Sequence, residues 1–170
     1  LEHRGPDGSG VWFDESISLG HNRLSIVDIH GSQQPIIGNS NTVLIANGEI
    51  YNHLDLRSKL NYNWKTSGDS EVILALHEKY AKNVAKVGDI NHTDWVKQLN
   101  GMFSFALWDS ENQELILARD SLGIKPLVRT IIDGSLLFAS EMKAFHAHES
   151  YQPRIDETAL ALRLAWEYCL

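Results

Sequence analysis

The chain has 170 residues, of which 43% are hydrophobic and 22% charged, and its formal net charge is -7. This length fits one ordinary domain, and the negative charge excludes a nucleic-acid-binding surface, which needs clustered Lys and Arg. The longest apolar runs are far shorter than the ~20 residues that span a bilayer, so no membrane segment is expected. A single cysteine, Cys169, excludes an internal disulfide and agrees with a cytoplasmic location.

In chain order, the first predicted elements are strands. Residues 17–21 show the short apolar and polar alternation of a strand, and residues 42–46 are apolar enough to be buried on both faces of a sheet. The Asn47-Gly48 pair that follows is a typical turn dipeptide. We therefore expect the second strand to end there.

Helices and hairpins fill the rest of the chain. Residues 70–80 place Val72, Leu76 and Tyr80 on one helical face, and Asp69 is a candidate N-cap for this helix. Further elements are expected as a short helix at 94–98, hairpins that join 102–108 to 114–119 and 127–132 to 136–139, and a final helix at 157–168. The mixture predicts an α+β fold.

Seven short segments carry the clearest functional signal, and their order matters as much as their content. They are HRGPD (3–7), GHNRLSIVD (20–28), NGEIYN (47–52), SGDSE (67–71), LNGMFSFA (99–106), RDSLGIKPL (119–127) and FASEMKA (138–144). In this order they resemble the class II glutamine amidotransferase domain, and most closely the glutaminase domain of the asparagine synthetases. The resemblance covers residues 1–145 and implies a four-layer αββα sandwich of the N-terminal nucleophile hydrolase type. Residues 146–170 are then a connection and helix leading toward a synthetase domain.

The resemblance also implies that the given sequence begins after the family's nucleophile, a cysteine at the mature N-terminus whose own α-amino group is the base. A first strand and helix, about 25 residues by mean element lengths, would precede His3. We therefore expect the 170 residues alone to be inactive, whereas the parent protein would hydrolyse glutamine to glutamate and ammonia. Cys169 is expected to be a small buried side chain and not the nucleophile.

Asn47 and Gly48 are the candidate catalytic residues. By resemblance, the side-chain amide of Asn47 and the backbone N–H of Gly48 form an oxyanion hole for the tetrahedral intermediate. Glu49 is expected to help fix the same segment. Without the surrounding match, the Asn-Gly pair indicates only a turn.

A free amino acid presents one carboxylate and one ammonium group, so its pocket needs a fixed cation and a fixed anion. By resemblance, Arg23 binds the carboxylate of L-glutamine through its guanidinium fork, and Asp69 binds the ammonium group. Pocket-lining backbone is expected from the residues that follow the arginine, which are Leu24, Ser25, Ile26 and Val27. The alternatives are a solvated arginine, a simple helix cap and a plain edge strand. His21, beside the arginine, is expected to be a structural hydrogen-bonding residue.

The remaining expectations concern cofactors, partners and competing functions. The eight histidines do not form a metal-ligand pattern, so no metal or other cofactor is expected in this domain. ATP and Mg²⁺ are expected in a synthetase domain of the same parent chain, where ammonia would be used for asparagine synthesis, and a homodimer is a further expectation. Two alternatives stay open: a non-catalytic glutamine-binding or scaffold domain, and an amidotransferase domain that feeds a different product. A cysteine directly after the initiator methionine would favour catalysis.

Overall fold

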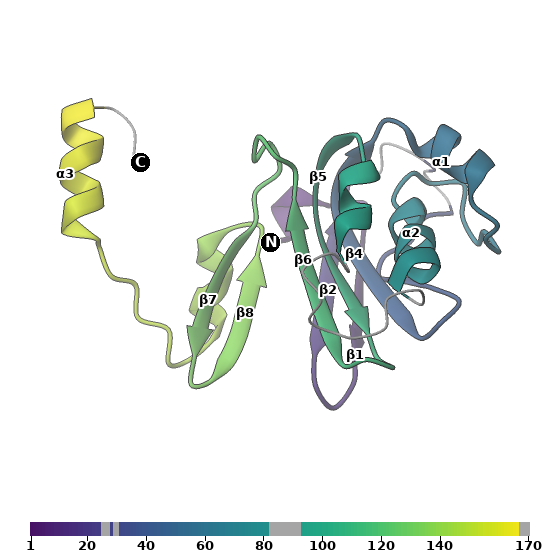
Figure 1. Cartoon of the computed structure of the whole chain (residues 1–170). Coiled ribbons are helices and arrows are strands. Elements are labelled where there is room, and N and C mark those ends of the chain that lie inside the picture. The colour runs from purple at the N-terminus through teal and green to yellow at the C-terminus, as the bar shows by residue number, and fades with distance from the viewer. Residues whose placement is uncertain (25–27, 29–30, 82–92, 167–170) are drawn as a thin grey trace. The chain divides into compact units, whose positions relative to one another are not determined.

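The computed structural model describes residues 1–24, 28, 31–81 and 93–166 (Figure 1). The predicted pocket residues Ser25, Ile26 and Val27, and also Cys169, lie outside the described residues. The chain divides into two compact units, Leu1–Leu127 and Val128–Leu170, and each is described by itself. The functional assignment of residues 1–145 and 146–170 stays a prediction.

The first unit contains two antiparallel sheets. One sheet pairs β1 (Gly8–Phe13) with β2 (Ser18–Arg23). The other has the order β3 (Ile36–Ile37), β4 (Thr42–Ile50), β5 (Gly101–Asp109) and β6 (Glu114–Arg119). The helical elements of this unit are η1 (Glu2–Arg4), α1 (His53–Lys59), α2 (Glu71–Ala81) and η2 (Asp94–Gln98), of which η1 and η2 are 3₁₀ helices.

The core of the first unit lies between α2 and one face of the β4–β5 pair (Figure 1). Successive side chains of a strand point to opposite faces, so every second residue of each strand faces the helix. The buried side chains on this face and on the helix are Leu44, Ala46, Ile50, Phe103, Phe105, Leu107, Val72, Ile73, Leu74, Ala75 and Leu76. On the opposite face, Trp108 Nε1 donates to Asp14 Oδ2 at 2.8 Å, which ties the β1–β2 turn to β5.

The second unit is built on a hairpin. β7 (Val128–Ile132) pairs with β8 (Ser135–Ala139), and the chain continues through the 3₁₀ helix η3 (Met142–Ala147) to α3 (Glu157–Trp166). Asp133 and Gly134 both have positive φ, at 51° and 81°, as the favoured two-residue hairpin turn requires.

Most of the predicted elements are confirmed. The α+β class, the helix at 70–80, the helical segment at 94–98 and both predicted hairpins are all present. The helix predicted at 157–168 is described as far as Trp166, and its last two residues lie outside the described residues. The sequence patterns missed β1, β3 and α1.

The predicted end of the second strand at Asn47-Gly48 is wrong. β4 continues to Ile50, with Gly48 in register opposite Phe103 of β5. Gly48 has a φ of 150°, and a Cβ at this position would lie 2.1 Å from the backbone oxygen of Met102. Glycine is therefore used here to let two strands approach closely and not to make a turn.

Candidate functional site

The site predicted from the sequence centres on one edge of β4. The N–H of Tyr51, directly after β4, donates to the carbonyl of Asn100 at 2.8 Å, which fixes the phase of the β4–β5 ladder. Because the hydrogen-bonding direction alternates along a strand, the even-numbered residues of β4 direct their N–H groups away from β5. We call this side the outer edge of β4, and it comprises Thr42, Leu44, Ala46, Gly48 and Ile50.

On both sides of Gly48, the backbone groups at the outer edge of β4 have hydrogen-bond partners. Leu44 is paired with Ile36 of β3. Ala46 N–H donates to Gln34 Oε1 at 2.6 Å, while the Ala46 carbonyl accepts from Gln34 Nε2 at 2.8 Å. Ile50 N–H donates to Asp69 Oδ2 at 2.6 Å. Within the described part of the chain, no group accepts a hydrogen bond from the N–H of Gly48, which is an exposed residue.

Asn47 and Glu49 flank this glycine on the face of the sheet that points away from α2. Both residues are half-buried, and neither side chain makes a hydrogen bond with any residue that the structure describes. The side-chain amide of Asn47 and the backbone N–H of the adjacent Gly48 are therefore both without a hydrogen-bond partner among the described residues. Two uncommitted donors on neighbouring residues of one strand can together bind a developing negative charge.

Asp69 lies in the segment that leads into α2, and its side chain is only 6% exposed. Oδ2 accepts from Ile50 on β4, whereas Oδ1 has no hydrogen-bond partner among the described residues. The alternative that this side chain caps the helix is wrong, because α2 begins at Glu71 and the carboxylate bonds to the sheet. A buried carboxylate with an open oxygen suits an ammonium group.

Arg23 ends β2 and is also only 6% exposed, which excludes a freely solvated arginine. Its Nη2 donates to the backbone carbonyl of Asp28 at 2.6 Å. The N–H of Asp7 donates to the Arg23 carbonyl at 3.0 Å, so the 3–7 segment lies beside β2. Leu24, the next residue, is 57% exposed and follows the strand as coil, and the prediction for residues 25–27 lies outside the described residues.

Arg23 and Asp69, which we call the predicted clamp, are linked through Asp28, a residue that the sequence patterns did not single out. Its Oδ2 accepts from Ser32 Oγ at 2.7 Å and from the Ser67 N–H at 3.1 Å, while Oδ1 accepts from the Gly31 N–H at 3.0 Å. The hydrogen bond from the Ser32 hydroxyl, with those from Ser67 and Gly31, holds the pKa of this carboxyl below its usual value. The Arg23 loop is thereby fastened to the segment that carries Asp69.

Glu71 and Arg57 fix the same segment from its other side. Glu71 is fully buried, and its carboxylate accepts from the Lys65 N–H, the Thr66 N–H and the Thr66 hydroxyl, each at 2.8 Å. Arg57 donates to the carbonyls of Thr66 and Gly68 at 2.5 and 2.9 Å. A buried acid is stable only when its oxygens are satisfied in this way, so Glu71 orders residues 65–66 just ahead of Asp69.

His21 supports β4 from β2, as expected of a structural residue. Its Nε2 lies 3.0 Å from the Ala46 carbonyl. A carbonyl only accepts, so we assign the proton to Nε2, which leaves the buried Nδ1 without a partner in the described residues. Burial lowers the pKa of His21, and the nearby charge of Arg23 lowers it further. The hydrogen bond to Ala46 raises this pKa, but the net shift is downward. The ring is therefore neutral in the folded protein at neutral pH.

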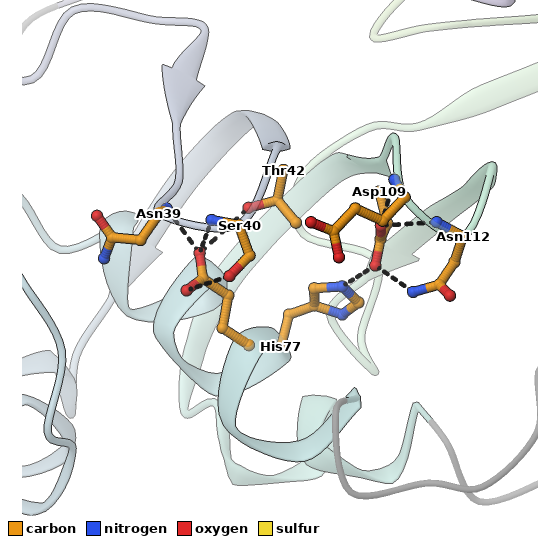
Figure 2. Close-up of polar contacts among 8 residues, drawn as sticks. Asn39, Ser40, Thr42, His77, Asp109 and Asn112 are labelled. Carbon is orange, nitrogen blue, oxygen red and sulfur yellow. Dashed lines mark hydrogen bonds and ion pairs between the residues drawn. The ribbon is translucent and has the colours of Figure 1, made fainter.

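The far end of α2 is anchored to the opposite end of the sheet (Figure 2). Glu78 accepts from the N–H groups of Asn39 and Ser40 and from the Thr42 hydroxyl. His77 Nε2 lies 3.0 Å from Asp109 Oδ2. Although burial raises the pKa of Asp109, the hydrogen bonds from Asn112 and His77 outweigh it and hold this pKa below its usual value. Both ends of α2 are thus fixed relative to β4 and β5.

Among residues 1–24, 28, 31–81 and 93–166, no group of three His, Cys, Asp or Glu side chains is placed to hold a metal ion. No helix in the same residues is long and apolar enough to cross a membrane.

Comparison with known proteins identifies the family. A family model described as "Glutamine amidotransferase domain" matches residues 1–169. The glutamine-hydrolyzing asparagine synthetase 3 of Bacillus subtilis (strain 168) is 39% identical over 168 residues, which is 95% of this chain and 25% of that protein. The glutamine-hydrolyzing asparagine synthetase B of Escherichia coli (strain K12) is 43% identical over 148 residues, or 85% of this chain and 25% of that protein. The chain thus spans about a quarter of the length of these relatives.

Two solved structures share the fold. An allosteric regulatory enzyme of purine biosynthesis superposes with a TM-score of 0.64 at 23% identity, over 81% of this chain and 30% of that chain. The glutamine phosphoribosylpyrophosphate amidotransferase of B. subtilis gives a TM-score of 0.55 at 24% identity, over 76% of this chain and 28% of that chain. Together with the family match, this confirms the resemblance carried by the seven segments: the chain belongs to the class II glutamine amidotransferase domain family and resembles the N-terminal domain of asparagine synthetase.

Proposed function

We propose that this domain hydrolyses the side-chain amide of L-glutamine, and that Asn47 and Gly48 stabilise the oxyanion formed in this reaction. The observation that carries the proposal is the outer edge of β4, where side chains accept hydrogen bonds from the N–H groups of Ala46 and Ile50 while no described residue accepts one from Gly48. Donors fixed in advance where negative charge develops lower the barrier without reorganising during the reaction.

In the proposed pocket, Arg23 binds the α-carboxylate and Asp69 binds the α-ammonium group of glutamine. Arg23 is held by Asp28, and the Asp69 carboxylate is held by β4 through one oxygen. Glu49, next to the oxyanion donors, and the backbone of residues 24–27 complete the proposed lining. Both charged groups are attached to the α-carbon of glutamine, so binding both fixes the orientation of that end and directs the side-chain amide toward the donors on β4.

The proposed nucleophile is a cysteine at the mature N-terminus of the parent protein, as the resemblance implies. The thiol proton passes to the α-amino group of that cysteine, and the thiolate attacks the amide carbon. When the tetrahedral intermediate collapses, the C–N bond breaks and ammonia leaves with the proton. Water then hydrolyses the thioester to glutamate and regenerates the thiol.

We further propose that the ammonia is passed to an ATP- and Mg²⁺-dependent synthetase domain of the same parent protein, for asparagine synthesis. The names of the relatives support this assignment. The four-layer αββα arrangement, with a first strand and helix ahead of residue 1, belongs to the same proposal. The shared fold of the phosphoribosylpyrophosphate amidotransferase is consistent with it.

The test is the release of ammonia from L-glutamine by the parent protein carrying its N-terminal cysteine. Asn47→Ala should lower kcat by roughly 100-fold, as expected when an oxyanion donor is removed, and should leave KM little changed. Asn63→Ala, the same change at an exposed site outside the proposed pocket, is the control and should have no such effect. A wild-type kcat in Asn47→Ala would place the oxyanion elsewhere, and no glutaminase activity in the unmodified protein would reject the function itself.

A further inference from the structure

Gln34 occupies the place where the β3–β4 ladder would next continue. Ile36 pairs with Leu44 and Ile37 with Val43, so the same antiparallel register sets Gln34 opposite Ala46. The backbone of Gln34 does not take that place. Its side-chain amide instead accepts from the Ala46 N–H at 2.6 Å and donates to the Ala46 carbonyl at 2.8 Å. The amide therefore substitutes for one peptide group of a neighbouring strand.

The backbone of Gln34 is diverted toward β1, where a glycine makes room for it. A Cβ on Gly10 would lie 2.1 Å from the Gln34 carbonyl oxygen and 3.0 Å from Cδ of Pro35. Had the backbone stayed in the ladder, the strand would have continued two residues further and reached the position opposite Gly48. The substitution by a side chain thus holds Ala46 while leaving the Gly48 N–H open.

We propose that Gln34 is a positioning residue for glutamine hydrolysis, which fixes β4 at Ala46 so that the Gly48 N–H keeps its direction toward the oxyanion. This inference rests on the proposed function of the Gly48 N–H. The Ala46 carbonyl also accepts from His21, so the strand is held at this point by two side chains from different segments. In this role Gln34 acts through β4 and not directly on the substrate.

The direct test measures amide hydrogen exchange residue by residue in the 170-residue chain. Gln34→Met keeps the length of the side chain and removes both hydrogen bonds, so the Ala46 amide should exchange about 10-fold faster or more. Gln34→Glu keeps an acceptor for the Ala46 N–H and loses the donor to its carbonyl, so its effect should be smaller. Gln33→Met, the same change at the exposed neighbouring glutamine, is the control. Unchanged exchange at Ala46 in Gln34→Met would overturn the proposal that Gln34 holds β4 at Ala46.

The second measurement asks whether the hydrogen bonds between Gln34 and Ala46 matter for the reaction. In the parent protein with its N-terminal cysteine, Gln34→Met should lower kcat for ammonia release about 10-fold while KM stays within about 2-fold, because only the transition-state donor is misplaced. Gln33→Met should match the wild type. A raised KM with an unchanged kcat, or no change in either, would overturn the positioning role. If the wild type itself releases no ammonia, the proposed function fails, and the exchange measurement still decides whether Gln34 holds β4.

Discussion

At the scale of single residues, Gly48 serves a different purpose on each of the two edges of β4. Leu44, Ala46 and Ile50 direct their N–H groups to the outer edge of β4 and each has a partner there, whereas Gly48 has none among the residues that the structure describes. A side chain at position 48 would meet the backbone of Met102 at 2.1 Å. The same residue thus meets a packing requirement toward β5 and offers a hydrogen-bond donor on the opposite edge.

Asp28 offers a prediction at this scale, because it fastens Arg23 to the Asp69 segment without belonging to the proposed clamp. Asp28→Asn retains the positive φ of 50° but weakens the hydrogen bonds that the carboxylate accepts. The KM for glutamine should rise about 10-fold, equivalent to ~1.4 kcal/mol, while kcat changes little. The measurement is steady-state ammonia release by the parent protein.

The matched control for this change is Asp133→Asn. Asp133 also has a positive φ, 51°, but lies on the exposed β7–β8 turn. Asp133→Asn should leave kcat and KM at their wild-type values. A lowered kcat with an unchanged KM in Asp28→Asn would contradict the view that Asp28 sets the spacing of the clamp.

At the scale of elements, α2 is the part that links the site to the rest of the first unit. Its first residue, Glu71, orders the segment ahead of Asp69, and His77 and Glu78 near its other end hold the turns at the far end of the sheet (Figure 2). The helix packs against β4 and β5 between these anchors. The distance between the segment of Asp69 and the β4 edge is therefore set by the whole helix and not by one hydrogen bond.

The contact between β2 and β4 makes stability depend on pH through His21. Burial lowers the folded-state pKa of this ring below its ordinary value of 6.5, so as the pH falls from about 7 into the window below that value the unfolded chain binds a proton before the folded chain does. Stability that is fully present above pH 7 should therefore be lost as the pH falls through this window. His21→Gln, which cannot titrate, should show a smaller fall in Tm between pH 7 and pH 5.

The carboxyl groups with a lowered pKa do not contribute to this pH dependence. The pKa values of Asp28, Asp109 and Asp120 lie below their ordinary value of 3.8, so these carboxylates stay ionised down to pH 5. From pH 7 to pH 8 the two proteins should differ by a constant amount in Tm. An equal loss of Tm in both proteins between pH 7 and pH 5 would show that His21 is not the group responsible.

At the scale of the whole molecule, the sequence predicted what depends on local pattern and missed what depends on distant contacts. The spacing of Val72, Leu76 and Tyr80 was enough to predict α2, and the motif matches selected Arg23 and Asp69. Asn47-Gly48 misled the strand prediction, because a turn signal is local while the pairing of Gly48 with Phe103 spans much of the chain. Tertiary pairing overrides local preference in such cases.

The supporting residues could not be found from spacing alone. Asp28 and Ser67 are 39 residues apart in sequence, Ile50 and Asp69 are 19 apart, and Gln34 and Ala46 are 12 apart. No local pattern reports that these pairs meet. Glu71 carried a weaker signal, since an acid that begins an otherwise apolar helix can be either a solvated end or, as here, a fully buried acceptor.

The most direct test of the glutamine pocket is a titration of the 170-residue chain with L-glutamine, followed by the amide NMR signals of individual residues. We predict saturable shifts of the Gly48 backbone amide and the Asn47 side-chain amide, and weaker binding in Asp69→Asn. L-Glutamate, which lacks the side-chain amide, should shift these two signals less. Saturable binding that leaves Gly48 and Asn47 unchanged, or no binding of glutamine at all, would contradict the account.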